Sequence, residues 1–209
     1  KMLRTLLCSL AIMQAVTAFQ MATPFTSFTP SSSLSIGAGP AVSLRSRTSA
    51  ARSVVMKSPD VNAQAPAFKL PDSTGKLVGL DNFKGKWTVL YFYPKAFTQG
   101  CTCQAEGFQK DAGEIKKLGA EIVGVSTDPV QKLDEFAKAY GLTFPLLSDE
   151  NGKTAEAYGS ALKLPFVGTF ANRKTFIIDP TSRLRYAFDS VDAKKSSADV
   201  IAKLKELQA

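Results

Sequence analysis

The chain has 209 residues, 44% of them hydrophobic, which is enough for one sizeable core and a further segment outside it. Its net charge of +8 is unevenly distributed, because the first 57 residues hold six of the 26 basic residues and no acidic one. The remaining chain is nearly balanced in charge, which excludes the usual basic surface of a nucleic-acid-binding protein.

The first 56 residues predict a two-part targeting leader. Lys1 and Arg4 precede the apolar stretch 6–16, which is too short to span a bilayer and is followed by small residues suited to cleavage. We therefore expect a signal peptide at 1–18. Residues 19–56 are rich in Ser, Thr, Ala and Arg and lack acids, which is typical of a transit peptide.

The junction between these two parts resembles a known targeting signal. Residues 15–19, Ala-Val-Thr-Ala-Phe, are similar to the Ala-x-Ala-Phe junction of plastid-targeted proteins in diatoms and related algae. The resemblance implies a plastid protein, and the alternative is a secreted protein with a Ser/Thr-rich linker. No other segment is apolar for long enough to cross a membrane, so no membrane partner is expected.

Residues 57–209 are expected to form one domain. A turn at 72–76 between two short apolar segments predicts an N-terminal β-hairpin. The run 87–93, Trp-Thr-Val-Leu-Tyr-Phe-Tyr, is apolar on both faces and predicts a central strand that Pro94 ends.

Downstream, helical and strand patterns alternate. The expected helices are about 102–118, 130–140, 155–158 and 198–207, and the expected strands are 121–126, 144–147, 175–178 and 183–188. Asp128 is expected to cap the second of these helices, with Pro129 in its first turn. This order predicts an α/β fold with a mixed central sheet flanked by helices and an N-terminal hairpin extension.

The cysteines suggest a nucleophile rather than a disulfide scaffold. Cys8 lies in the leader, which leaves Cys101 and Cys103 in the domain. The chain has no histidine, so any cysteine nucleophile must be activated without an imidazole. Cys101 follows the central strand and lies in the first turn of the next helix, where unpaired amides and the helix dipole favour a thiolate.

The residues before Cys101 predict a small polar pocket. The Thr98 hydroxyl is placed to cap the same helix and to donate to the sulfur or to a bound oxygen. Gly100 allows a close approach of the backbone to a ligand, and Pro94 fixes the loop and shields one side. Phe97 either lines this pocket or covers the core. Such a pocket suits a small, oxygen-bearing ligand.

Several landmarks in chain order resemble the peroxiredoxins, closest to the Q-type or bacterioferritin-comigratory branch. The resemblance covers about 61–207 and rests most specifically on the spacing Pro94, Thr98, Cys101 after a strand. The landmarks are Ala65-Pro66-x-Phe68, Tyr91-Phe92-Tyr93-Pro94-Lys95, Thr98-x-Gly100-Cys101-Thr102, Val123-Gly124-Val125-Ser126 and Arg173-x-Thr175-Phe176-x-x-Asp179.

This resemblance implies a thioredoxin-like fold and a peroxidase that reduces hydrogen peroxide or alkyl hydroperoxides without metal, haem or other cofactor. It implies that Cys101 is the peroxidatic cysteine, oxidised to a sulfenic acid. It also implies that Thr98 binds the peroxide beside Pro94, and that Arg173 stabilises the thiolate and the charge that develops on the oxygens.

One position departs from the Q-type pattern. That branch often carries a resolving cysteine five residues after the peroxidatic one, where this chain has Glu106. Cys103 is the possible resolving cysteine. In a regular helix, side chains two positions apart point about 200° away from each other, so a Cys101–Cys103 disulfide would require the first turn to unwind. Otherwise thioredoxin, glutaredoxin or glutathione reduces Cys101 directly, or two chains share a mixed disulfide. We expect a monomer or a weak homodimer.

Two other functions stay open at this point. Residues 96–101 also resemble the atypical type-5 peroxiredoxins. From another class, a thioredoxin-fold binding or redox-sensing protein could hold copper or zinc through Cys101 and Cys103, although two thiolates without a histidine make a poor site.

Overall fold

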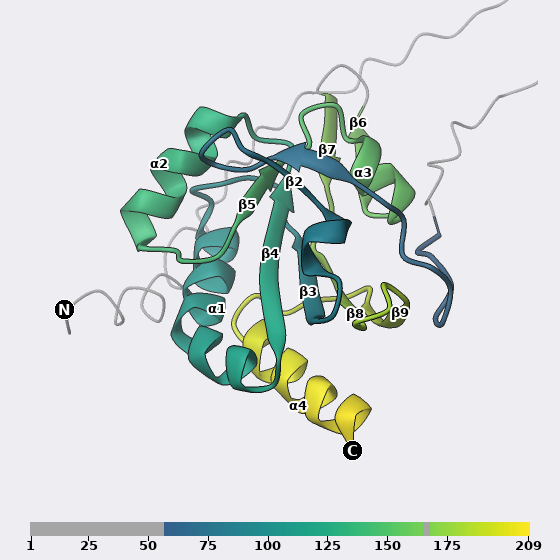
Figure 1. The fold of residues 1–209 in the computed structure, drawn as a ribbon. Coiled ribbons are helices and arrows are strands. Elements are labelled where there is room, and N and C mark those ends of the chain that lie inside the picture. The colour runs from purple at the N-terminus through teal and green to yellow at the C-terminus, as the bar shows by residue number, and fades with distance from the viewer. Residues whose placement is uncertain (1–56, 165–167) are drawn as a thin grey trace, which may run out of the picture. The chain divides into compact units, whose positions relative to one another are not determined.

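A computed structural model describes residues 57–164 and 168–209 (Figure 1), which lie in the compact unit Ser53–Ala209. The expected signal peptide at 1–18 and transit peptide at 19–56 lie outside the described residues. No helix in the described ranges combines the length and the apolar character that a bilayer crossing requires.

A five-stranded mixed sheet forms the centre of the fold, as predicted. The strand order is β5-β4-β3-β8-β9, in which β3, β4 and β5 are parallel and β8 and β9 run antiparallel to β3 and to each other. These strands are β3 (Trp87–Phe92), β4 (Ala120–Ser126), β5 (Leu146–Ser148), β8 (Lys174–Ile178) and β9 (Leu184–Phe188).

Helices cover one face of this sheet, and β3 shows why. Its residues alternate between two faces, so Val89 and Tyr91 pack against one group of side chains and Leu90 and Phe92 against another. The first group includes apolar side chains of α1, α2 and α4, which lie around the sheet in Figure 1. These helices are α1 (Gln99–Lys117), α2 (Val130–Tyr140) and α4 (Ser196–Gln208).

The other face is covered by the N-terminal elements, α3 and β7. The predicted N-terminal hairpin is present as an antiparallel pair. These elements are β1 (Lys69–Pro71), β2 (Leu77–Gly79), the 3-10 helix η1 (Leu80–Phe83), α3 (Lys153–Ala157) and β7 (Gly168–Ala171).

The pair β6 (Ala161–Leu164) and β7 is present but was not predicted. Both strands are four residues long, and the sequence pattern around them, with Pro165 after β6 and Gly168 at the start of β7, is typical of a loop. The pair forms a separate two-stranded sheet, so neither strand shows the apolar pattern of the main sheet. Here tertiary position decided the structure more than periodicity did.

The cap of α2 and the start of α1 differ from the expectation. Pro129, not Asp128, occupies the N-cap position of α2, and the Asp128 carboxylate binds the Lys132 side chain of that helix. The helix α1 begins at Gln99, three residues before the predicted start, because the apolar periodicity that located it is weak in its polar first turn. Cys101 is therefore the third residue of α1.

Candidate active site

The candidate site lies where β3 ends and α1 begins. Pro94 has no amide hydrogen, so the β3 ladder stops after Tyr93, whose N–H donates to the Val125 carbonyl at 3.1 Å. A short connection then leads to Thr98, the N-cap residue of α1, whose carbonyl accepts the first helical hydrogen bond from Thr102 N–H at 2.9 Å. The chain thus turns within a few residues from a central strand into a helix that holds the predicted nucleophile in its first turn.

Cys101 is a buried free thiol in the first turn of α1, with 1% of its surface exposed. Its side chain belongs to the core group that also contains Ala96 and Ala105. The first-turn amides of the helix point toward its N-terminal end, where a negative charge is stabilised. The structure therefore places the predicted sulfur in the electrostatic setting expected for a thiolate.

Arg173 reaches this sulfur from β8. The residue immediately precedes that strand, and its Nη2 donates to Cys101 Sγ at 3.2 Å, although 72 positions separate the two in the chain. The Nη1 atom donates to the Gly100 carbonyl at 3.5 Å. These contacts place a positively charged guanidinium directly beside the thiol.

Gly100 lies directly against the Arg173 guanidinium. A Cβ atom placed on it would lie 3.1 Å from Arg173 Nη2. The missing side chain therefore leaves room for the guanidinium. A side chain at this position would crowd the contact between Arg173 and Cys101.

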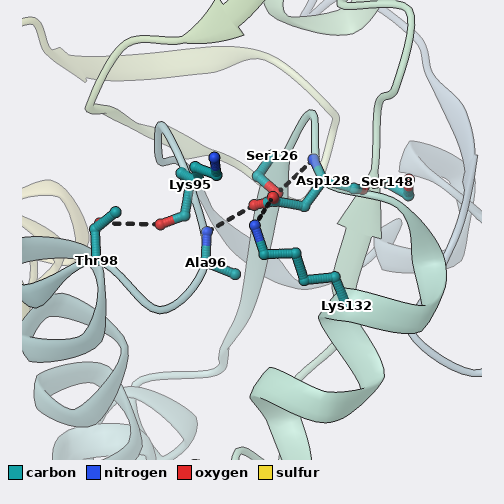
Figure 2. Close-up of polar contacts among 7 residues, drawn as sticks. All are labelled: Lys95, Ala96, Thr98, Ser126, Asp128, Lys132 and Ser148. Carbon is teal, nitrogen blue, oxygen red and sulfur yellow. Dashed lines mark hydrogen bonds and ion pairs between the residues drawn. The ribbon is translucent and has the colours of Figure 1, made fainter.

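Thr98 lies on the same loop, but its hydroxyl does not cap the helix as expected. It donates to the Lys95 carbonyl at 3.0 Å, which closes a small turn within the loop (Figure 2). The side chain is exposed, so the hydroxyl oxygen faces the solvent side of the site. Phe97 packs its ring on α2, at centroid distances of 5.1 Å from Phe136 and 6.2 Å from Tyr140.

Gln104 is a site residue that the sequence analysis missed. It is fully buried, its Oε1 accepts a hydrogen bond from Arg173 Nη1 at 2.6 Å, and its Nε2 donates to Ser196 Oγ at 3.0 Å. The signal was present in the pattern, because a polar residue interrupts the apolar side of α1 that runs through Ala105 and Phe108. A buried polar group of this kind requires partners.

Tyr91 and Thr175 form a polar layer next to the site. They are directly opposite each other on β3 and β8, and neither hydroxyl has a hydrogen-bond partner within the described residues. Burial raises the pKa of Tyr91 well above its ordinary value, negative charge on Tyr93 or Cys101 would raise it further, and Arg173 lowers it. Tyr91 is therefore neutral at physiological pH.

Cys103 lies in α1, two residues after Cys101, and is partly buried. Both residues are within the regular helix, so their side chains leave the helix axis about 200° apart. Among the described residues, no three or more Cys, His, Asp or Glu side chains gather as a metal site would require.

A comparison with protein families identifies this arrangement. Residues 61–187, more than half of the chain, match the AhpC/TSA family. The chain is 40% identical over 145 residues to the peroxiredoxin Bcp of Escherichia coli K12, a match that covers 68% of this chain and 93% of that protein. It is 39% identical over 144 residues to the chloroplastic peroxiredoxin Q of Triticum aestivum, covering 69% of this chain and 65% of the relative.

Solved structures give the same assignment. The peroxidoxin BcpB of Mycobacterium tuberculosis matches with a TM-score of 0.66 and 34% identity, covering 74% of this chain and 99% of that one. The bacterioferritin comigratory protein of Xanthomonas campestris, whose structures address alkyl peroxide reduction, matches with a TM-score of 0.65 and 31% identity, covering 74% and 99%. The chain thus belongs to the AhpC/TSA family and is a peroxiredoxin of the Bcp and Q type, a thiol peroxidase with a thioredoxin-like fold.

Proposed function

We propose that Cys101 is the peroxidatic cysteine of this enzyme and that Arg173, Thr98 and Pro94 form its peroxide site. The observation that carries this assignment is the 3.2 Å contact between Arg173 Nη2 and Cys101 Sγ at the first turn of α1. A guanidinium and a helix N-terminus both stabilise a thiolate, which is the reactive form of a cysteine. This explains how the thiol is activated in a chain that has no histidine.

The chemistry follows from this geometry. The Cys101 thiolate attacks one peroxide oxygen, the O–O bond breaks, and the sulfur becomes a sulfenic acid while water or an alcohol leaves with the second oxygen and a proton. Sulfur loses two electrons, and the peroxide gains them. Arg173 stabilises the negative charge that moves from sulfur to the leaving oxygen, and the Thr98 hydroxyl orients the peroxide. We include both hydrogen peroxide and alkyl hydroperoxides as substrates.

Replacement of the nucleophile tests the assignment. Cys101→Ser should abolish peroxide consumption, because a serine hydroxyl is not ionised at neutral pH. The matched variant is Cys103→Ser in the same helix, which should still be oxidised by the first equivalent of peroxide. Stopped-flow measurement of peroxide loss with the reduced proteins distinguishes the two variants. Full consumption of peroxide by the Cys101→Ser protein would contradict the proposal.

Arg173 has its own test. Arg173→Gln should lower the rate constant for peroxide reduction about 100- to 1,000-fold, as expected when one donor to a developing oxyanion is lost. Arg185→Gln is the control, because Arg185 makes only a 3.5 Å ion pair with Asp179, away from the thiol. Equal rate constants for peroxide reduction in the two variants would show that Arg173 does not take part in the reaction.

We infer that an external thiol returns Cys101 to the reduced state. The helix that contains Cys101 and Cys103 is regular from Gln99 onward, and a disulfide between these two residues requires its first turn to unwind. Thioredoxin, glutaredoxin or glutathione can instead attack the sulfenic acid to form a mixed disulfide and water, and a second thiol then releases Cys101. Mass spectrometry after one equivalent of peroxide distinguishes the routes: an internal loss of two hydrogens supports Cys103, and a thiol adduct supports the external route.

We further propose that residues 57–209 form the enzyme and that 1–18 and 19–56 are a signal peptide and a plastid transit peptide. The acid-free composition of the leader supports this, and relatives named as chloroplastic occur at about 40% identity. A fluorescent protein fused behind residues 1–56 and expressed in a diatom should accumulate in the plastid. Its secretion would favour the alternative that the segment is a secretory signal followed by a linker.

A further inference from the structure

The loop between β3 and α1 is held by one buried carboxylate, that of Asp128. This residue follows the end of β4 and is 6% exposed. Its Oδ2 accepts a hydrogen bond from the Ala96 backbone N–H at 2.6 Å and from Ser126 Oγ at 3.2 Å, and its Oδ1 binds Lys132 Nζ at 2.6 Å (Figure 2). The Asp128 carbonyl also accepts a hydrogen bond from Ser148 Oγ at 2.7 Å.

The bond to Ala96 is the contact that matters for the site. Ala96 is buried and lies midway between Pro94 and Thr98, outside both β3 and α1, so neither the strand ladder nor the helix supplies an acceptor for its N–H. A buried amide without an acceptor is costly, and a charged acceptor forms a stronger bond than a neutral one. The Asp128 carboxylate therefore determines where the middle of this loop lies.

The neighbouring residues transmit this position to the site. Phe97 adopts a φ of +66°, which a bulky residue rarely adopts unless its surroundings impose it, and its ring is held by Phe136 of α2. The next residue is Thr98, whose hydroxyl bonds back to the Lys95 carbonyl. A loop so short and so constrained moves as a unit, so a displacement of Ala96 also displaces Pro94 and Thr98.

Cys101 is held differently. Its position depends on the regular helix α1, on core packing with Ala105, and on the Arg173 contact. None of these contacts includes Asp128. Loss of the Asp128 carboxylate would therefore displace the loop that precedes α1 while the thiol and its guanidinium stay in place.

We propose that Asp128 is a positioning residue for peroxide reduction, which holds the loop of Pro94 and Thr98 over the Cys101 sulfur through the Ala96 N–H. This inference rests on the proposed role of Cys101. Asp128 does not touch the reacting atoms in this arrangement. It acts through the loop, so its contribution falls on the alignment of the peroxide and not on the reactivity of the sulfur itself.

Two reactions of the same sulfur separate these contributions. The full chain, with Cys8→Ser to remove the leader thiol, is reduced and then exposed either to hydrogen peroxide or to iodoacetamide. Oxidation and alkylation of Cys101 are followed over time by mass spectrometry of the Cys101 peptide. Iodoacetamide needs a reactive thiolate but no aligned peroxide, so it reports the state of the sulfur alone.

Asp128→Ala should lower the rate constant with peroxide roughly 10- to 100-fold, the scale expected for misplacing groups that orient a reactant. The rate constant with iodoacetamide should not fall. Asp128→Asn keeps a carbonyl oxygen that can accept from the Ala96 N–H, so it should recover part of the peroxide rate, and it also serves if the alanine variant does not fold.

Asp149→Asn is the matched control. Asp149 is another buried carboxylate that accepts backbone N–H groups, those of Thr154 at 3.2 Å and Ala155 at 2.8 Å, but these amides begin α3, and Ala155 packs against the other face of the sheet. The Asp149→Asn substitution should leave the rate constants with peroxide and with iodoacetamide unchanged.

An unchanged peroxide rate in both Asp128 variants would overturn the inference, as would an equal fall in the two reactions. If the parent chain with an intact Asp128 does not react with peroxide, the role of Cys101 fails instead, so the two failures are distinguishable.

Discussion

The Arg173 guanidinium contacts two side chains: one of its nitrogens donates to Cys101 and the other donates to Gln104. The Gln104 side chain is fully buried and bonds both to Arg173 and to Ser196, the first residue of α4. A guanidinium pairs well with a planar oxygen acceptor held at a fixed position. The orientation of Arg173 therefore depends on a neutral amide that is itself anchored to a different helix.

Gln104→Leu should impair both stability and activity. The substitution leaves Arg173 Nη1 and Ser196 Oγ without their partner, so the free energy of unfolding should fall by about 1 to 3 kcal/mol. The peroxide rate should fall as well, because Arg173 is no longer held on the thiol. Urea unfolding and stopped-flow peroxide reduction measure the two effects.

The control is Gln109→Leu on the same helix. Its Oε1 accepts from the Thr143 backbone N–H at 2.8 Å, at an exposed position away from Cys101. This variant should keep the peroxide rate of the parent. If both glutamine variants lose activity equally, Gln104 has no specific role in holding Arg173.

At the scale of elements, β3 and β4 pair beside the site through residues of very different size, Tyr91 and Gly124. The Tyr91 ring lies over Gly124, and a Cβ on that glycine would come within 2.8 Å of Tyr91 Cζ and Oη and of Leu146 Cδ2. The phenol therefore occupies the space that a side chain on β4 would take. The small residue in β4 lets the aromatic layer under α1 pack against the sheet.

Two glycine substitutions should have opposite effects. Gly124→Ala forces Tyr91 or Leu146 to shift and should destabilise the protein by about 1 to 3 kcal/mol. Gly113→Ala, in the exposed part of α1 with nothing within 4 Å of the added Cβ, should stabilise it by roughly 0.5 to 1 kcal/mol. Thermal and urea unfolding check both values, and a stabilising Gly124→Ala would show that the contact with Tyr91 is relieved at no cost.

At the scale of the whole molecule, the segment before β1 lies along the edge of the sheet. Asn62 N–H donates to the Leu184 carbonyl at 2.6 Å, and Leu184 N–H donates to the Ala63 carbonyl at 2.9 Å. Further out, Asp189 accepts hydrogen bonds from Lys174 Nζ and Ser58 Oγ, both at 2.7 Å. The start of the described chain is thus attached to β9 by backbone bonds, and the Ser58 hydroxyl links it to Asp189 and to Lys174 of β8 by hydrogen bonds.

This attachment should depend on pH. The hydrogen bond from Lys174 and then that from Ser58 hold the pKa of Asp189 below its ordinary value. A carboxyl whose native pKa is depressed adds stability above its unfolded pKa of about 3.9, and that stability is lost as the pH falls through the lower native pKa. Asp189 is 64% exposed in its side chain, so the gain should be at most about 1 kcal/mol and should decrease in high salt.

The measurement compares Asp189→Asn with the parent chain by urea unfolding across the pH range. The variant should be less stable at pH 7 and at pH 5, and the difference should disappear well below pH 4. A difference that remains constant into strong acid would show that the ionised carboxylate is not the source of the effect.

Local sequence accounts for much of this protein. A strand, a short loop and a helix with a thiol in its first turn follow from the aromatic run of β3, from Pro94, which ends that strand, and from the spacing to Cys101. Each of these depends on neighbours within a few residues. The same order of landmarks also indicated the family that the comparisons confirmed. The tertiary structure decided what surrounds the sulfur. Arg173, just before β8, donates to it, and Gln104 bonds to α4. The Asp128 carboxylate accepts from the Ala96 N–H and does not cap α2 as expected. These contacts join residues distant in the chain, and a polar residue's partner depends on which groups the fold buries beside it.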